Sequence, residues 1–130
     1  MQLYLEKDYI TIEYDEVNNI LVQKWMLAPA FDEFREGMNH LVEAIVHFKT
    51  GRLLSDTTKL GALHSDNQAW VATVWFERAV KAGYSRVAII VPSDIFTQMS
   101  VEDAISQVTN PIPFSYFDNP VEALEWMKKY

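Results

Sequence analysis

The chain has 130 residues, no cysteine and a formal net charge of −7 at neutral pH. This length suits one domain, and the lack of cysteine excludes a disulfide framework, a thiol nucleophile and a thiolate metal site. The eleven Lys and Arg residues are scattered, so we expect no nucleic-acid partner, because neutralising phosphates requires clustered cations. We find no secretory leader and no apolar run near the roughly 20 residues that span a bilayer, and therefore expect a cytoplasmic protein without membrane insertion.

The N-terminal part predicts a β-hairpin followed by a helix. Residues 9–14 and 20–25 are rich in β-branched and aromatic side chains, and residues 15–19 between them have turn chemistry. Pro29 ends the second strand, and apolar residues at steps of three and four predict a helix over residues 30–48. The expected buried face of this helix comprises Phe31, Phe34, Met38, Leu41, Val42 and Ile45.

Residues 52–82 predict a short buried strand over 52–56, a polar loop and a helix rich in tryptophan. This helix is expected to begin at Ser65, because a hydroxyl followed three residues later by Gln68 is a capping-box pattern. Gly83 is expected to end it in a left-handed conformation. The side chains that share its predicted buried side are Trp70, Val71, Val74, Trp75 and Ala79.

The C-terminal part continues the alternation of strands and helices. Residues 86–91 are continuously apolar, which is typical of a strand covered on both faces. A single helical turn is expected at residues 95–96, then a separate helix from Ser100 to about residue 108 and a strand over 114–117. Asn119 is the predicted cap of the last helix, with Pro120 at its first position.

This order of elements predicts one α/β (α+β) domain over residues 1–130. We expect a single mixed β-sheet of about five strands, with an N-terminal hairpin and four main helices packed on it.

The histidines do not suggest a metal or catalytic site. His40 and His47 lie seven residues apart on one predicted helix, about 10 Å along its axis, which is too far for both to bind one ion. His64 directly precedes Ser65, and side chains of adjacent residues diverge at a helix start, so we expect no nucleophile–base pair there. No metal is expected.

Other catalytic patterns are also missing. The four glycines are too far apart for a phosphate-binding loop, and no cofactor is expected. The adjacent carboxylates at 15–16 and 102–103 cannot face each other across a cleft. The protein is therefore predicted not to be an enzyme, with an unrecognised hydrolase kept as a lesser alternative.

Two groups of residues are candidates for binding. The first group is Trp25, Trp70, Trp75 and Phe76, which are either core residues or the lining of a small-molecule pocket. Phe76 and Trp126 lie outside the main apolar stripes and could instead form a pocket rim or a subunit contact. The second group is a polar edge between the third predicted strand and the following helix, formed by Asp56, Thr57, Thr58, Ser65, Asp66 and Asn67. A phosphoryl group on Ser65 would meet the positive end of the helix dipole, whereas Asp66 would oppose it.

Several segments, in this order and spacing, resemble the STAS domain, and in particular its SpoIIAA-like branch of small stand-alone bacterial proteins. They are residues 54–58 (LSDTT), 70–76 (WVATVWF), 82–84 (AGY), 91–96 (VPSDIF), 116–119 (YFDN) and 123–126 (ALEW). The resemblance spans nearly the whole chain. It implies a SpoIIAA-like fold and, by position, a phosphate-accepting role for Ser65, as in anti-sigma-factor antagonists. Those antagonists carry Asp-Ser-Ser/Thr-Gly there, whereas this chain has His64, Ser65, Asp66 and Asn67.

The resemblance and the residues lead to two main hypotheses. The first is a non-enzymatic regulatory module that binds a protein partner through the polar edge. The second is a carrier or sensor of a small apolar ligand or lipid beneath the tryptophan helix, because the branch is related in fold to lipid-carrying CRAL-TRIO domains. The aromatic residues expected at the surface make a homodimer a further hypothesis.

Overall fold

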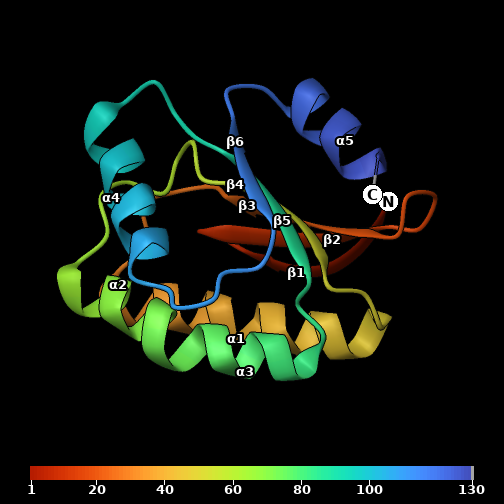
Figure 1. Ribbon diagram of the computed structural model, residues 1–130, viewed down its shortest axis with the longest axis horizontal. Helices are drawn as coiled ribbons and strands as arrows, with labels where there is room; N and C mark the ends of the chain where they lie inside the picture. Colours follow the sequence, from red (N-terminus) through yellow and green to blue (C-terminus); the bar gives the residue numbers. More distant parts are fainter. Residues whose placement is uncertain (130) are drawn as a thin grey trace.

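The computed structural model describes residues 1–129 and forms one six-stranded sheet with helices on both faces (Figure 1). The strands lie in chain order across the sheet, from β1 to β6. Strands β1 to β3 pair antiparallel, and β3 to β6 pair parallel, which confirms the predicted mixed sheet. The strand bounds are β1 Gln2–Lys7, β2 Ile10–Asp15, β3 Ile20–Trp25, β4 Arg52–Asp56, β5 Arg86–Ile90 and β6 Phe114–Phe117.

Strand β1 was not predicted. Its register against β2 shifts between Leu3 and Leu5, so the side-chain alternation that identifies a half-buried strand is broken in the middle. The five predicted strands correspond to β2 through β6, and β1 adds a sixth at the open edge beside β2.

The helices divide unequally between the two faces of the sheet. Helices α1 (Phe31–Phe48) and α3 (Phe76–Ala82) lie side by side on one face, and α5 (Pro120–Lys128) covers the other (Figure 1). Helix α4 (Ile95–Ser106) follows β5 and packs against the helical segment that precedes α3. Within residues 1–129, no helix combines the length and apolar composition needed to cross a bilayer.

Helix α1 buries most of its predicted face. Phe34, Met38, Leu41 and Ile45 are buried, whereas Phe31, in its first turn, is exposed. Asn119 accepts a hydrogen bond from the Glu122 amide and caps α5, as predicted.

The tryptophan helix has an irregular centre. It consists of α2 (Ser65–Trp70), a π-helical segment η1 (Val71–Trp75) and α3 without a break in the chain. A π turn contains more residues than an α turn, so it changes the side of the helix that following residues face. Val74 is consequently 41% exposed, and its predicted burial is wrong, while Trp75 and Ala79 lie in the core.

The segment after β5 also differs from the prediction. Residues 95–106 form one helix, α4, capped by Asp94, whose carboxylate accepts a hydrogen bond from the Phe96 amide. The predicted helix start at Ser100 is wrong because this hydroxyl is buried and accepts a hydrogen bond of 2.6 Å from the Leu63 amide. The Ser100 hydroxyl therefore stabilises a contact between α4 and a distant loop, and it does not cap a helix.

Candidate functional site

A cavity of about 100 Å³ lies in the core, between the sheet and the helices on its α1 face. Strands β3, β4 and β5 contribute Trp25, Leu53 and Ile89, while η1 contributes Trp75 and α4 contributes Ala104. These five side chains are all buried. The layer that should be close-packed in a domain of this size therefore contains a partly open pocket lined mostly by apolar groups.

A second cavity of about 60 Å³ adjoins the first. Both are lined by the same core residues from η1, β5 and α4, which include Val71, Trp75 and Val87, and both are lined by Tyr84. The second extends toward Phe76 and Ile112. The two cavities form adjacent lobes under the π-helical segment.

The π-helical segment η1 places Trp75 over this space. The indole Nε1 of Trp75 donates a hydrogen bond of 2.7 Å to the Met38 carbonyl of α1, which fixes the ring against the neighbouring helix. Single π turns inside α-helices occur frequently at functional sites. The π turn could not be predicted from the sequence, because residues 65–82 have helical composition throughout.

The structure separates the four predicted pocket residues. Trp25 and Trp75 line the first cavity, and Trp75 and Phe76 line the second. Trp70 lines neither, since its ring contacts Phe34 and lies 5.1 Å from the Arg35 guanidinium carbon. Trp126, expected at a pocket rim or a subunit contact, belongs to α5 and packs against Phe117 on the opposite face of the sheet.

Most polar groups in the cavity wall are hydrogen-bonded within the protein. The Ser55 hydroxyl donates to the Gln23 side-chain oxygen at 2.9 Å, and the Gln23 amide nitrogen lies 3.5 Å from the Met38 sulfur. The Thr57 hydroxyl donates to the Ile90 carbonyl at 2.8 Å. Polar groups in a dry core cost free energy unless paired, and these pairs avoid that cost.

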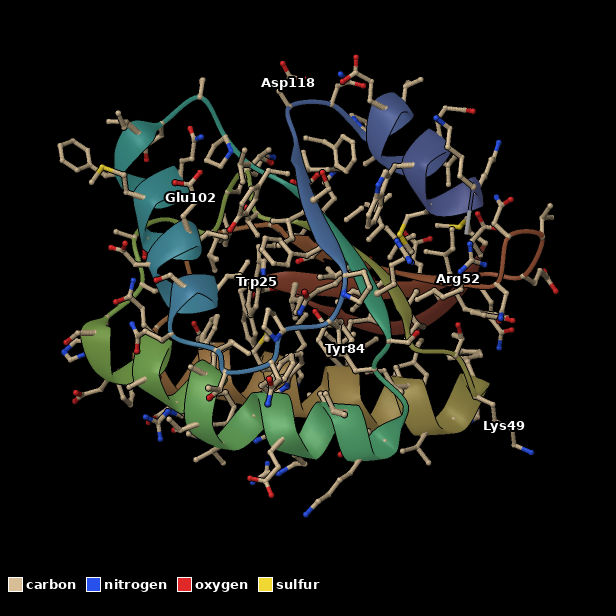
Figure 2. The ribbon with its side chains drawn as sticks, viewed as in Figure 1. Trp25, Lys49, Arg52, Tyr84, Glu102 and Asp118 are labelled. Atoms are coloured by element: carbon tan, nitrogen blue, oxygen red, sulfur yellow. The ribbon has the colours of Figure 1, made fainter. Side chains whose placement is uncertain are left out.

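Tyr84 is the exception. Gly83, with φ +121°, ends α3 and turns the chain, and the Tyr84 amide donates to the Ala79 carbonyl at 2.9 Å. The Tyr84 ring meets the Trp75 ring edge-to-face at 5.3 Å, on the α1 side of the sheet (Figure 2). Its hydroxyl makes no hydrogen bond within residues 1–129, and its oxygen keeps some accessible surface, unlike the Tyr9 hydroxyl, which is fully buried without a partner. Burial raises the pKa of this phenol well above its ordinary value, so it stays protonated.

The predicted polar edge is only partly a surface. Asp56 and Thr58 form a local turn, in which the Asp56 carboxylate accepts hydrogen bonds from the Thr58 amide and hydroxyl. Thr57 between them is buried and faces the first cavity. The strand end thus presents Asp56 and Thr58 outward and Thr57 inward.

At the start of α2, Ser65 and Asp66 are exposed and Asn67 is buried. Asn67 accepts a hydrogen bond of 2.8 Å from the Arg35 side chain, which anchors α2 to α1. The predicted capping role of Ser65 is wrong, because His64 has the extended backbone of a cap and its Nδ1 accepts from the Asp66 amide at 3.0 Å. The Ser65 hydroxyl makes no hydrogen bond within the described residues.

Helix α4, which contacts α2, carries three exposed apolar side chains near its start. Ile95, Phe96 and Met99 are 62%, 73% and 52% exposed. The Gln68 side chain donates to the Ser100 carbonyl at 2.8 Å, which joins α2 to the same turn of α4. The spacing of Ile95, Phe96 and Met99 would place them on one side of a continuous helix, but only a single helical turn was predicted at residues 95–96.

The remaining titratable residues do not converge. His40 on α1 lies 3.0 Å from Glu43 and 3.7 Å from Glu36, and the His47 ring packs on Tyr4 and Phe48. In residues 1–129, no three His, Asp or Glu side chains are arranged to hold a metal ion.

The comparisons with known proteins agree with this architecture. A family model described as SpoIIAA-like matches residues 21–128. Among solved structures, the chain is similar to an uncharacterised protein of the DUF3478 family with a SpoIIAA-like fold from Shewanella loihica PV-4. The two are 24% identical, the alignment covers 91% of each chain, and the TM-score is 0.59, which shows a shared fold. No curated protein matches the chain.

Proposed function

Because this chain belongs to the SpoIIAA-like family, we propose that it is a non-enzymatic STAS-like module that binds a small apolar molecule in its core, as a carrier or sensor. The observation that carries this proposal is the pair of adjoining apolar cavities between the sheet and the helices. A void deprives its lining atoms of dispersion contacts, so a ligand that fills it restores them.

The size and the lining of the cavities limit the ligand. An engineered cavity of about 150 Å³ lined by apolar side chains stays dry and binds benzene. The first cavity here measures about 100 Å³ and the second about 60 Å³, so the available space suits a molecule of about one ring. A long-chain lipid would require the helices to move apart.

Filling the cavity from inside the protein tests the proposal. Ala104 lines the first cavity and is buried, and Ala104→Leu would place three further carbons in that space. We expect native mass spectrometry of the purified wild type to show a bound small mass that Ala104→Leu lacks. Ala69→Leu is the matched control, because Ala69 is exposed on α2. An identical unliganded mass for all three proteins, with no binding of added benzene by calorimetry, would contradict the proposal.

A second candidate function is docking of a protein partner at the surface formed by Ser65, Asp66 and the α4 cluster Ile95, Phe96 and Met99. Contiguous exposed apolar side chains bordered by polar groups are typical of interaction sites. The exposure of these three α4 side chains supports this candidate. In a module of the anti-sigma-factor-antagonist type, phosphate on Ser65 would alter the charge of this same surface.

The docking candidate predicts a local effect of mutation. Cross-linking in cells followed by mass spectrometry is expected to identify a partner peptide joined near α4, and Phe96→Ser should remove that cross-link. Val121→Ser is the matched control, because Val121 is 70% exposed on α5, on the other face of the sheet. Equal loss of the cross-link in both variants would show that the α4 surface is not the docking site.

A further inference from the structure

We infer that the Tyr84 hydroxyl is the polar anchor of the cavity, and that the ligand is an uncharged molecule of about one ring bearing one hydrogen-bonding oxygen. This inference rests on the cavity-binding function proposed above and specifies the chemistry of the ligand.

Nearly all polar side chains in the cavity wall form hydrogen bonds within the protein. Gln23, Ser55, Thr57 and the indole of Trp75 each have a partner within the protein. The Tyr84 hydroxyl has none among residues 1–129, although the residue is only 9% exposed. A hydroxyl in an apolar pocket without a protein partner can form a hydrogen bond with a ligand, so a ligand oxygen that pairs with it would favour binding.

Tyr84 lines both cavities, together with Trp75, with which it makes an edge-to-face contact. A ring in the larger lobe, with its oxygen directed toward the boundary between the lobes, would place that oxygen within reach of the phenol. Because the phenol stays protonated, it can donate to a carbonyl or an ether and can donate to or accept from a hydroxyl.

Neither cavity is lined by a charged side chain. Burying an ion without a partner of opposite charge is strongly unfavourable, so a carboxylate, a phosphate or an amine in its charged form does not suit this site. The ligand class is therefore a neutral alcohol, phenol, ether or carbonyl compound of about one ring.

A matched pair of probes tests the inference. Phenol and benzene differ by one oxygen, and Tyr84→Phe removes the matching oxygen from the protein. We expect calorimetric titration to show that Tyr84→Phe weakens phenol binding about fivefold, the usual effect of one hydrogen bond, while benzene binding stays within twofold. Tyr116→Phe is the control, because Tyr116 is a half-buried tyrosine on β6 that lines neither cavity.

The outcomes separate this inference from the proposed function. Equal binding of phenol by wild type and Tyr84→Phe would overturn the anchor role of Tyr84 and leave the cavity function intact. Failure of both probes to bind any of the three proteins would overturn both. Tyr84→Phe removes a hydroxyl without a protein partner, so its unfolding midpoint is expected to equal or exceed that of the wild type, which excludes misfolding as the cause of weaker binding.

Discussion

At the residue scale, the start of α2 has a different cap from the one that the sequence pattern predicts. A serine before a helical run usually caps the helix, but here the preceding His64 takes that role through its ring nitrogen. The serine hydroxyl remains exposed and without a hydrogen bond in the described chain. Ser65 is thus exposed to solvent at a helix start. The sequence alone cannot distinguish such a serine from one that caps the helix.

This assignment predicts different effects for two neighbouring alanine substitutions. His64→Ala removes the cap and is expected to lower the free energy of unfolding by about 0.5–2 kcal/mol. Ser65→Ala should change it by less than about 0.5 kcal/mol, as at ordinary surface positions. Urea denaturation at pH 7 measures both. A larger loss for Ser65→Ala than for His64→Ala would show that Ser65 is the cap.

Asp94, which caps α4, predicts a dependence of stability on pH. A hydrogen bond of 2.7 Å from the Thr97 hydroxyl, with another from the Phe96 amide, lowers the pKa of Asp94 below its ordinary value. A lowered pKa in the folded state means that the charged form stabilises the fold above the unfolded pKa, and that this contribution is lost as the pH falls through the folded pKa. Asn keeps a cap but cannot ionise. The wild type is therefore expected to be more stable than Asp94→Asn at pH 7, and the difference should shrink below about pH 4.

Urea denaturation of the two proteins at pH 7 and pH 3 measures this difference. A gap in unfolding free energy that does not change with pH would contradict the charge-based account of this cap.

At the element scale, the π turn at Val71–Trp75 links the helix to the cavities. The extra residue lets Trp70 pack toward α1 while Trp75 and Ala79 still face the core. Trp75 and Val71 line both cavities, so the irregular turn is also part of their wall.

Deleting one residue from this turn tests its role. Thr73 is exposed, and its hydroxyl donates only to the Ala69 carbonyl within the same helix. Its deletion is expected to convert the π turn to a regular α-helix, because such a turn is a local departure from the i→i−4 pattern. The flanking segments can then keep their packing, so the protein should fold, while benzene binding should weaken at least tenfold because the cavity wall is rebuilt.

Circular dichroism of the deletion variant checks that it folds, and calorimetric titration checks that its benzene binding is weaker. Thr73→Ala is the control, since it keeps the chain length. A folded deletion variant that binds benzene as the wild type does would show that the π turn does not shape the cavity.

At the scale of the whole molecule, the sequence was sufficient to predict the mixed sheet, the order of its elements from β2 onward and most of their bounds. Those predictions rested on the periodicity of apolar residues and on residues that start or end helices and strands, such as Pro29, Gly83 and the Asn119–Pro120 pair. The features that could not be predicted depend on contacts between distant residues. The Leu63 amide donates a hydrogen bond to the Ser100 hydroxyl, and the Arg35 side chain donates one to Asn67.

The candidate site divides in the same way. Its aromatic members could be identified from the sequence, and Trp25, Trp75 and Phe76 do line the cavities. Tyr84 was missed because a tyrosine after a helix-ending glycine has no distinctive pattern. Its significance lies in an unpartnered hydroxyl, which depends on every neighbouring side chain in the folded protein. A pocket cannot be predicted from the sequence pattern, because its shape depends on how all the surrounding side chains pack in the folded protein.

The most direct measurement is a crystal structure of the protein soaked in phenol. We predict density for one ring in the cavity between Trp75 and Ala104, with its oxygen within hydrogen-bond distance of the Tyr84 hydroxyl. An empty pocket at saturating phenol, or a ring bound only at the surface, would contradict the claim that this pocket is the ligand-binding site of the protein.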